Sequence, residues 1–250
     1  MDKSTDKPYP GSVSRANQNV RTDVRRFLDK VARTPAPVAS ATSVAGRGRL
    51  MFAMDATMSR ALAWDSALQI QAGMFEETEK IGGLAVQLVW FRGFHEFRVS
   101  PWVYDATALA QTMTGVGVRG GLTQIERVLT HALDEVGQGV KINALVYVGD
   151  SVEEEADVLC DKAGQLGMRG MPLFVFQEGY DKDAESIFCE MARLSGGAWS
   201  RFDGSSIAQL RDLLTAVAVY ATAGREALEK LGRHRGDVVR KIAGQIKQIK

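Results

Sequence analysis

Cysteine, histidine and long apolar runs are all scarce in this chain of 250 residues. Its two cysteines, Cys160 and Cys189, lie in segments with a helical pattern, so we expect free thiols in a reducing compartment and no disulfide framework. The three histidines are scattered, and none pairs with a cysteine at the spacing of a transition-metal site. No apolar run is long enough to span a bilayer, and the polar amino terminus lacks the apolar region of a signal peptide. We therefore expect a cytoplasmic protein without a membrane span.

The charge balance also excludes broad classes of function. The chain has 31 Lys and Arg against 30 Asp and Glu, a formal net charge of +1. This balance gives no overall attraction to nucleic acid or acidic membranes, so no nucleic-acid partner is expected. No P-loop, nucleophile elbow or Ser/His/Asp order is present. With 45% hydrophobic and 24% charged residues, the composition is that of a globular domain with a sizeable core.

Predicted strands alternate with predicted helices over most of the chain. This alternation is typical of an α/β fold, and it predicts a Rossmann-like, doubly wound, mostly parallel six-stranded sheet with helices on both faces. The segment 94–99 follows a turn at Gly93 and is expected to be an antiparallel edge strand. The expected strands are 50–54, 84–91, 94–99, 144–148, 172–176 and 198–202, and the expected helices are 61–81, 106–113, 122–136, 152–166, 184–194 and 207–223.

Two flanking segments lie outside this pattern. Residues 1–47 are rich in Pro, Ser, Ala and Gly and are predicted to be flexible, with one short helix at 20–31. Residues 224–250 form a basic amphipathic helix or tail. Such a helix suits a membrane surface, an acidic partner or nucleic acid. We favour the alternative that this segment is a solvated helix packed on its own domain. Three glycines in the segment further weaken its tendency to form a helix.

A polar cluster ends the first predicted strand. Asp55, Thr57 and Ser59 follow the apolar segment 50–54 directly, and a helical pattern comes next. Ligands of open α/β sheets bind at the carboxyl ends of the strands. One carboxylate and two hydroxyls at such a place suit a hard cation such as Mg²⁺. The alternative is a helix N-cap, where the same side chains accept the free N–H groups of the first turn.

Two further polar residues occupy comparable positions. Thr123 follows the glycine-rich loop 115–121 at the start of a predicted helix, and Asp150 ends the predicted strand 144–148. The loop contains a G-x-G-x-x-G, but it follows a helix and not a strand, so a dinucleotide site is not predicted. Each residue has a structural alternative: Thr123 as a first-turn hydroxyl, and Asp150 with the acidic run 153–155 as the cap of the following helix.

Taken in order, these clusters resemble the motifs of von Willebrand factor type A domains. The stretch DATMS at 55–59 resembles the family's D-x-S-x-S motif, and GGLT at 120–123 resembles its Gly-Gly-x-Thr segment. Asp150 matches the aspartate of its Thr-Asp-Gly segment, and LSGGAW at 194–199 resembles its late helix-to-strand segment. The resemblance covers residues 48–223, with the motifs in the family's order and spacing.

The resemblance implies a metal-ion-dependent adhesion site. By this likeness Asp55 reaches the metal mostly through water, Thr57 and Ser59 bind it directly, and Thr123 and Asp150 contribute directly or through water. The expected ion is Mg²⁺, with Mn²⁺ or Ca²⁺ as alternatives, and a carboxylate of a partner fills its open position. The chain departs from the family at Thr57, which replaces Ser, and at Gly-Asp-Ser 149–151, which replaces Thr-Asp-Gly. Both departures keep the ligand oxygen.

The implied function is a non-enzymatic, metal-dependent protein-binding module within a larger intracellular complex. Bacterial cytosolic members of the family serve AAA+ ATPase chaperone systems and tellurium-resistance complexes, and the resemblance implies a similar stress-resistance context. Two alternatives stay open. One is a metal-dependent hydrolase of phosphate esters that uses Asp150 or the run 153–155 as its base. The other is a scaffold with a vestigial metal site. An aspartyl-phosphate phosphatase is excluded because Thr57 stands where its second aspartate is needed.

Overall fold

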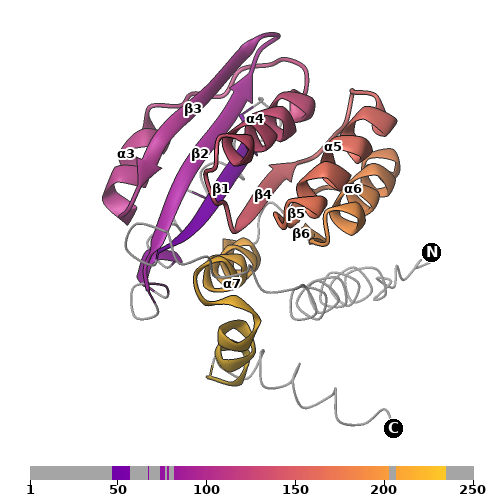
Figure 1. Ribbon diagram of the computed structural model, residues 1–250. Helices are drawn as coiled ribbons and strands as arrows, with labels where there is room; N and C mark the ends of the chain where they lie inside the picture. The colour runs from indigo at the N-terminus through magenta and orange to yellow at the C-terminus, as the bar shows by residue number, and fades with distance from the viewer. Residues whose placement is uncertain are drawn as a thin grey trace, which may run out of the picture.

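A six-stranded sheet forms the centre of the molecule (Figure 1). The computed structural model describes residues 47–56, 67, 74–76, 78, 82–202 and 207–234. The predicted flexible segment up to residue 46, the two hydroxyl residues Thr57 and Ser59, and residues 235–250 of the basic tail lie outside the described residues.

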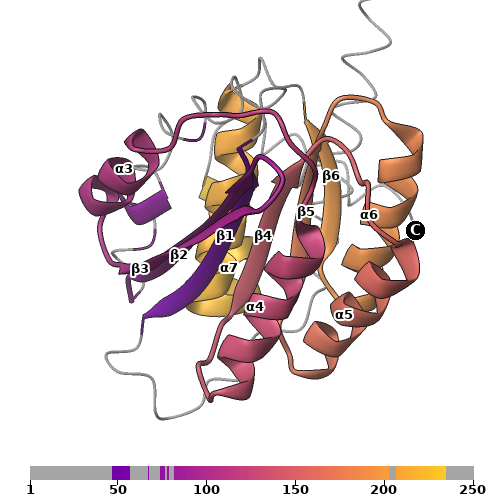
Figure 2. The same cartoon turned by 90° about the horizontal axis from the view of Figure 1, so that it is seen from above.

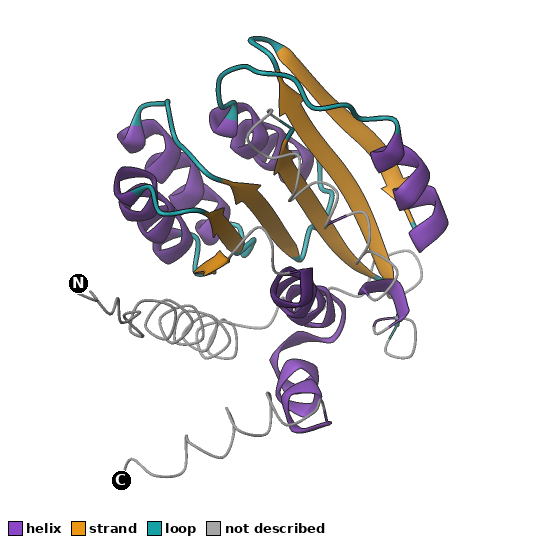
Figure 3. Ribbon diagram, turned by 180° about the vertical axis from the view of Figure 1, so that it is seen from behind, coloured by secondary structure: helices purple, strands orange, loops and turns teal. Residues whose placement is uncertain are grey.

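The strand order is β3-β2-β1-β4-β5-β6. Among the described strands, neighbours pair in parallel except β2 and β3, which pair antiparallel, so β3 is an antiparallel edge strand. The predicted Rossmann-like fold class is therefore confirmed, and Figure 3 shows the sheet from behind with helices on either side. The strands are β1 (Gly48–Asp55), β2 (Leu84–Arg92), β3 (Glu96–Val103), β4 (Ala144–Gly149), β5 (Leu173–Glu178) and β6 (Ala198–Phe202).

Helices cover both faces of the sheet (Figures 1 and 2). Because strand side chains alternate between faces, Leu50 and Phe52 of β1 join one buried cluster with α3 and α7, while Met51 and Ala53 join another with α4, α5 and α6. Burial on both faces explains the near-continuous apolar strands. The helices are α3 (Ala106–Thr114), α4 (Ile125–Gly137), α5 (Ala156–Met168), α6 (Lys182–Leu194) and α7 (Ile207–His234).

Several element boundaries differ from those predicted, and three of them change where polar residues lie. The edge strand β3 begins at Glu96 because residues 93–95 form the hairpin turn, in which Gly93 has a φ of 60°. The helix α4 begins at Ile125 and α5 begins at Ala156, several residues after their predicted starts at 122 and 152. The polar residues before both helices lie instead in loops at the carboxyl edge of the sheet.

The long helix α7 packs against the start of β1. A methyl group at Gly48 would lie 2.5 Å from the backbone oxygen of Ala221, so the two backbones approach too closely for a side chain there. The helix is interrupted at Gly224, whose φ of 72° and ψ of −165° are not helical. No helix in the described part of the chain combines the length and apolar character needed to cross a membrane.

The buried Tyr220 of α7 predicts an alkaline loss of stability. Its ring packs edge to face on Phe174 of β5, with 5.6 Å between ring centroids, and burial raises the pKa of Tyr220 to about 12. The unfolded chain loses this proton near pH 10, so the folded state holds more protons between about pH 10 and pH 12. The free energy of unfolding should therefore fall across this window by about 1.4 kcal/mol per pH unit.

Urea unfolding at several pH values between 9 and 12 tests this expectation, since Tyr220→Phe should remove this contribution to the decline. The matched control is Tyr180→Phe, because Tyr180 is exposed. Equal alkaline slopes in wild type and Tyr220→Phe would contradict the prediction.

Candidate functional site

The strand order creates a switch point between β1 and β4. The chain leaves β1 toward β2 on one side and later returns to pair β4 on the other side. In open α/β sheets a crevice forms at the carboxyl ends of the two strands that flank such a point. Met54 pairs with Val148, so Asp55 and Asp150 follow at the ends of these neighbouring strands. Asp55 is only 1% exposed. Two of the predicted ligand residues therefore lie where the fold favours ligand binding.

The loop between α3 and α4 crosses this edge of the sheet. The backbone N–H of Arg119 donates to the carbonyl of Ala56, the residue after Asp55, at 3.1 Å. The N–H of Leu122 donates to the carbonyl of Gly93 at 3.2 Å. These two bonds attach the loop to the ends of β1 and β2, and they carry Thr123 to the same edge as Asp55.

Close backbone contact makes Gly121 necessary in this loop. A Cβ atom at Gly121 would lie 2.0 Å from the carbonyl oxygen of Gly93, well inside van der Waals contact. The atoms in the way are backbone atoms, which cannot rotate aside as a side chain can. The neighbouring Gly120 has nothing within 4 Å of the equivalent position. The Gly-Gly pair of the sequence motif therefore contains one glycine with a clear steric role.

Thr123 is held by a reciprocal pair of bonds with Glu153. The N–H of Thr123 donates to Oε2 of Glu153 at 2.7 Å, and the N–H of Glu153 donates to Oγ1 of Thr123 at 3.1 Å. The Thr123 side chain is buried, with 6% of the residue exposed. A hydroxyl oxygen has two lone pairs, so Oγ1 retains acceptor capacity. The loop before α4 and the loop after β4 are thereby joined beside Asp150.

Glu154 caps the amino terminus of α4. Its carboxylate accepts the N–H of Ile125 at 2.9 Å and the N–H of Glu126 at 2.7 Å. The N-cap residue of α4, Gln124, makes no capping bond with its side chain. A carboxylate here satisfies unpaired N–H groups and complements the helix dipole. In the structural alternative, the acidic run caps its own helix. In the structure α5 begins after Glu155, and Glu154 caps α4 instead.

The donor groups at this edge have the chemistry of a hard-cation site. Asp55 and Asp150 offer carboxylates and Thr123 offers a hydroxyl, whereas Thr57 and Ser59 lie outside the described residues. The hydroxyl of Ser151 lies 3.4 Å from Oδ1 of Asp150, at the long limit of a hydrogen bond. Within the described residues, no group of three or more His, Cys, Asp or Glu side chains could hold a metal ion. The predicted donor set combines single carboxylates with hydroxyls, which fits Mg²⁺ better than a transition metal.

Sequence reasoning missed three residues that organise this edge. Glu153 and Glu154 were visible as an acidic run, but their partners, Thr123 before α4 and the first residues of α4, are 28 to 30 positions away in the chain. Arg119 carried no motif, yet its backbone attaches the loop to the end of β1. The signal for the glutamates was that the residue before α4 is Gln124, which is not the Ser, Thr, Asp or Asn of an ordinary N-cap, so that a cap had to come from elsewhere.

Comparisons with known proteins bear on the fold. Neither protein-family models nor curated protein sequences match the chain. Among solved structures, BatB from Bacteroides thetaiotaomicron matches with a TM-score of 0.52 and 15% identity, over 74% of this chain and 99% of that chain. The SpRpn10 VWA domain matches with a TM-score of 0.53 and 13% identity, over 67% and 94%. Proximal thread matrix protein 1 from the mussel byssus, described with a zinc-occupied MIDAS motif, matches with a TM-score of 0.52 and 13% identity, over 70% and 46%.

At these identities the likeness concerns the fold alone. The described chain has the fold of a von Willebrand factor type A domain, as the motif order predicted. The metal, the partner and the roles of individual residues are separate questions, which the geometry of the edge addresses.

The contact between Gly121 and Gly93 predicts a selective effect of adding one methyl group. Gly121→Ala should force the loop away from β2 and lower the free energy of unfolding by about 1–3 kcal/mol, the usual cost of overpacking. Gly120→Ala is the matched control and should change it by less than about 0.5 kcal/mol. Urea unfolding measures both, and equal effects would contradict the steric role of Gly121.

The cap on α4 gives a second stability prediction. Glu154→Ala leaves the N–H groups of Ile125 and Glu126 without their carboxylate and should lower the free energy of unfolding by about 1–2 kcal/mol. Glu155→Ala is the control, because Glu155 makes no side-chain capping bond to α5. Chemical denaturation at neutral pH compares the two, and an effect of Glu155→Ala as large as that of Glu154→Ala would argue against the cap.

Proposed function

We propose that this chain is a non-enzymatic, metal-dependent protein-binding module that captures an acidic residue of a partner through Mg²⁺. The proposed ligands are Asp55, Thr57, Ser59, Thr123 and Asp150 at the carboxyl edge of the sheet. The bound ion supplies an open coordination position for a carboxylate oxygen of the partner. The residues of the chain would hold and orient the ion and leave one coordination position to the partner.

One observation carries this proposal. Asp55 and Asp150 end neighbouring strands at the switch point, and the loop that contains Thr123 is bonded to the same edge of the sheet. The Arg119–Ala56 backbone bond and the Thr123–Glu153 pair bring the predicted motifs to one edge, although they lie far apart in the sequence. The divalent metal in the mussel protein of the same fold adds support for a cation at this type of site. Oxygen donors from hydroxyls and single carboxylates favour Mg²⁺ or Mn²⁺ over zinc here.

The hydrogen bonds of Glu153 and Glu154 favour a binding function over hydrolysis. A metal-dependent hydrolase needs a general base that is within reach of the reacting water. Besides Asp150, the candidate bases were the glutamates of the acidic run, of which Glu153 and Glu154 already accept backbone N–H groups at the start of α4 and just before it. These two side chains act as structural braces in the fold. The partner that we propose is a protein of an intracellular complex, such as an AAA+ ATPase or stress-resistance assembly, in accord with the family resemblance.

Thermal unfolding with and without divalent cation tests the metal. A ligand that binds only the native state stabilises it by mass action, by about 1.4 kcal/mol when its concentration is ten times Kd. For a domain of this size the midpoint should rise by about 3–6 °C in excess Mg²⁺ relative to EDTA. Asp55→Asn keeps the size of the side chain but removes the charge, and it should abolish the rise.

Asp134→Asn is the control, since Asp134 is an exposed carboxylate of α4 away from the switch point. It should retain the full response to Mg²⁺. A response that persists in Asp55→Asn would contradict the proposed ligand set. Turnover of p-nitrophenyl phosphate that Mg²⁺ restores after EDTA, and that Asp55→Asn removes, would contradict the non-enzymatic assignment.

A further inference from the structure

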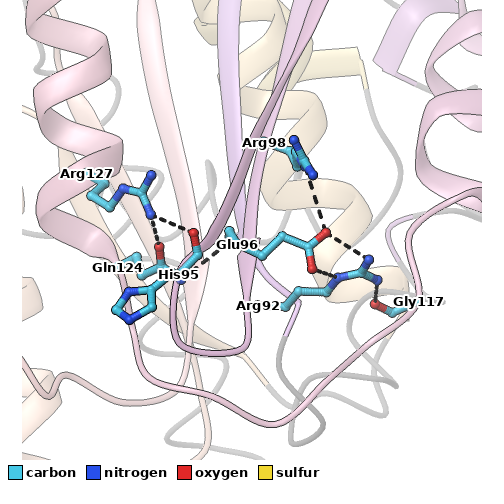
Figure 4. Close-up of polar contacts among 7 residues, drawn as sticks. All are labelled: Arg92, His95, Glu96, Arg98, Gly117, Gln124 and Arg127. Carbon is cyan, nitrogen blue, oxygen red and sulfur yellow. Dashed lines mark hydrogen bonds and ion pairs between the residues drawn. The ribbon is translucent and has the colours of Figure 1, made fainter.

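Two arginines, Arg92 and Arg98, flank Glu96 on the β2–β3 hairpin (Figure 4), and the charge of a third, Arg119, also acts on it. We call Arg92, Arg98 and Arg119 the arginine patch. Arg92 and Arg98 come from the β2–β3 hairpin, and Arg119 comes from the loop between α3 and α4. At the centre of the patch is Glu96, the first residue of β3. The patch is separate from the residues proposed to hold the metal.

Glu96 balances only part of this positive charge. Arg92 binds it in a bidentate pair, from Nε to Oε2 at 2.8 Å and from Nη2 to Oε1 at 2.9 Å. Nε of Arg98 lies 3.9 Å from Oε1. The hydrogen bonds from Arg92 are the main reason that the pKa of Glu96 lies below its usual value, and the charges of Arg92, Arg119 and Arg98 add to the effect. The charges of three guanidinium groups thus act on one carboxylate, and the formal charge of this group of four residues is +2.

The excess charge is accessible to a partner. The side chain of Arg98 is 65% exposed, and Arg119 is also exposed. Two exposed apolar side chains belong to the same two segments: Phe94 at the hairpin turn is 68% exposed, and Leu122 of the loop is 49% exposed. The bond from the Leu122 N–H to the Gly93 carbonyl places these two residues on adjoining segments. The surface therefore combines exposed arginines with a small apolar area.

The hairpin that carries the patch is fixed on both sides. Nη1 of Arg92 donates to the carbonyl of Gly117 in the loop. On the side of α4, Nη1 of Arg127 donates to the carbonyl of His95 at 3.1 Å (Figure 4). The guanidinium carbon of Arg127 also lies over the ring of Phe97, 4.7 Å from the ring centroid. A surface held in this way loses little conformational entropy when a partner binds.

The patch is continuous with the candidate metal edge. Arg119 donates its backbone N–H to Ala56, which directly follows Asp55. The backbone of Arg119 therefore lies next to the residue that follows the proposed ligand Asp55, so a partner bound at Asp55 lies near this loop. Positive charge at the rim of an interface steers acidic ligands and selects against basic ones.

We infer that the arginine patch, together with Phe94 and Leu122, selects an acidic peptide segment of the partner. This inference rests on the proposed function. One acidic residue of the segment binds the metal, further Asp or Glu residues face Arg98 and Arg119, and an apolar residue contacts Phe94 or Leu122. The surface fits a peptide better than nucleic acid, because two excess charges with an apolar area do not form the extended basic stripe that a phosphate backbone needs.

A displayed library of seven-residue peptides, selected on the immobilised full chain in Mg²⁺, tests the inference. The enriched sequences should contain at least two acidic residues and one Leu or Phe. The most enriched peptide, labelled with fluorescein, should bind Arg98→Gln/Arg119→Gln about tenfold more weakly than wild type and with less dependence on salt. Arg169→Gln is the matched control, an exposed arginine after the end of α5, and it should leave Kd unchanged.

The outcomes separate this inference from the proposed metal site. Binding that needs Mg²⁺ and Asp55 but is unchanged in the double arginine variant overturns the role of the patch and supports the proposed function. Binding that needs the arginines but persists in EDTA supports the patch and overturns the proposed function. Enrichment of neutral or basic peptides, the absence of enrichment, or displacement of the peptide by a single-stranded oligonucleotide at lower concentration than by free peptide overturns the inference.

Discussion

The close contact between Gly121 and the carbonyl of Gly93 is the constraint on which the carboxyl edge depends. It allows the loop before α4 to lie directly on the ends of β1 and β2. The same loop presents Arg119 to the hairpin on one side and Thr123 to the β4 side on the other. The candidate metal edge and the arginine patch are therefore two products of one backbone arrangement.

The acidic side chains at this edge have different roles. The Glu153 and Glu154 carboxylates accept N–H groups at the start of α4, and Glu96 is paired with Arg92. These acidic groups stabilise the edge of the fold. Asp55 and Asp150 lie at the ends of β1 and β4, Arg98 lies on the hairpin, and Arg119 lies in the loop between α3 and α4. A cation between the aspartates and an incoming carboxylate, with arginines at the rim, gives each charge of such a complex an opposite neighbour.

The sequence predicted much of the fold because its signals are local. Apolar strands buried on both faces, helical periodicity and the glycine turns indicated the α/β sheet and its antiparallel edge strand, both of which the structure confirms. The starts of α4 and α5 were placed too early. Thr123 and the acidic run 153–155 could have capped their own helices, but Thr123 and Glu153 bond to each other and Glu154 caps the start of α4. Local patterns cannot reveal a cap that comes from a segment about 30 positions away.

The sequence by itself determined which residues end the strands, because hydrophobic periodicity stops where the chain leaves the core, at Asp55 and at Asp150. It also determined the order of the motifs that resemble a von Willebrand factor type A domain. Only the tertiary structure decided that β1 and β4 are neighbours, that Glu154 caps α4, and that Arg119 lies against the hairpin turn at Gly93. The physical reason is that these relations depend on strand pairing and on loop contacts between distant segments, and their energies exist only when the whole sheet is assembled.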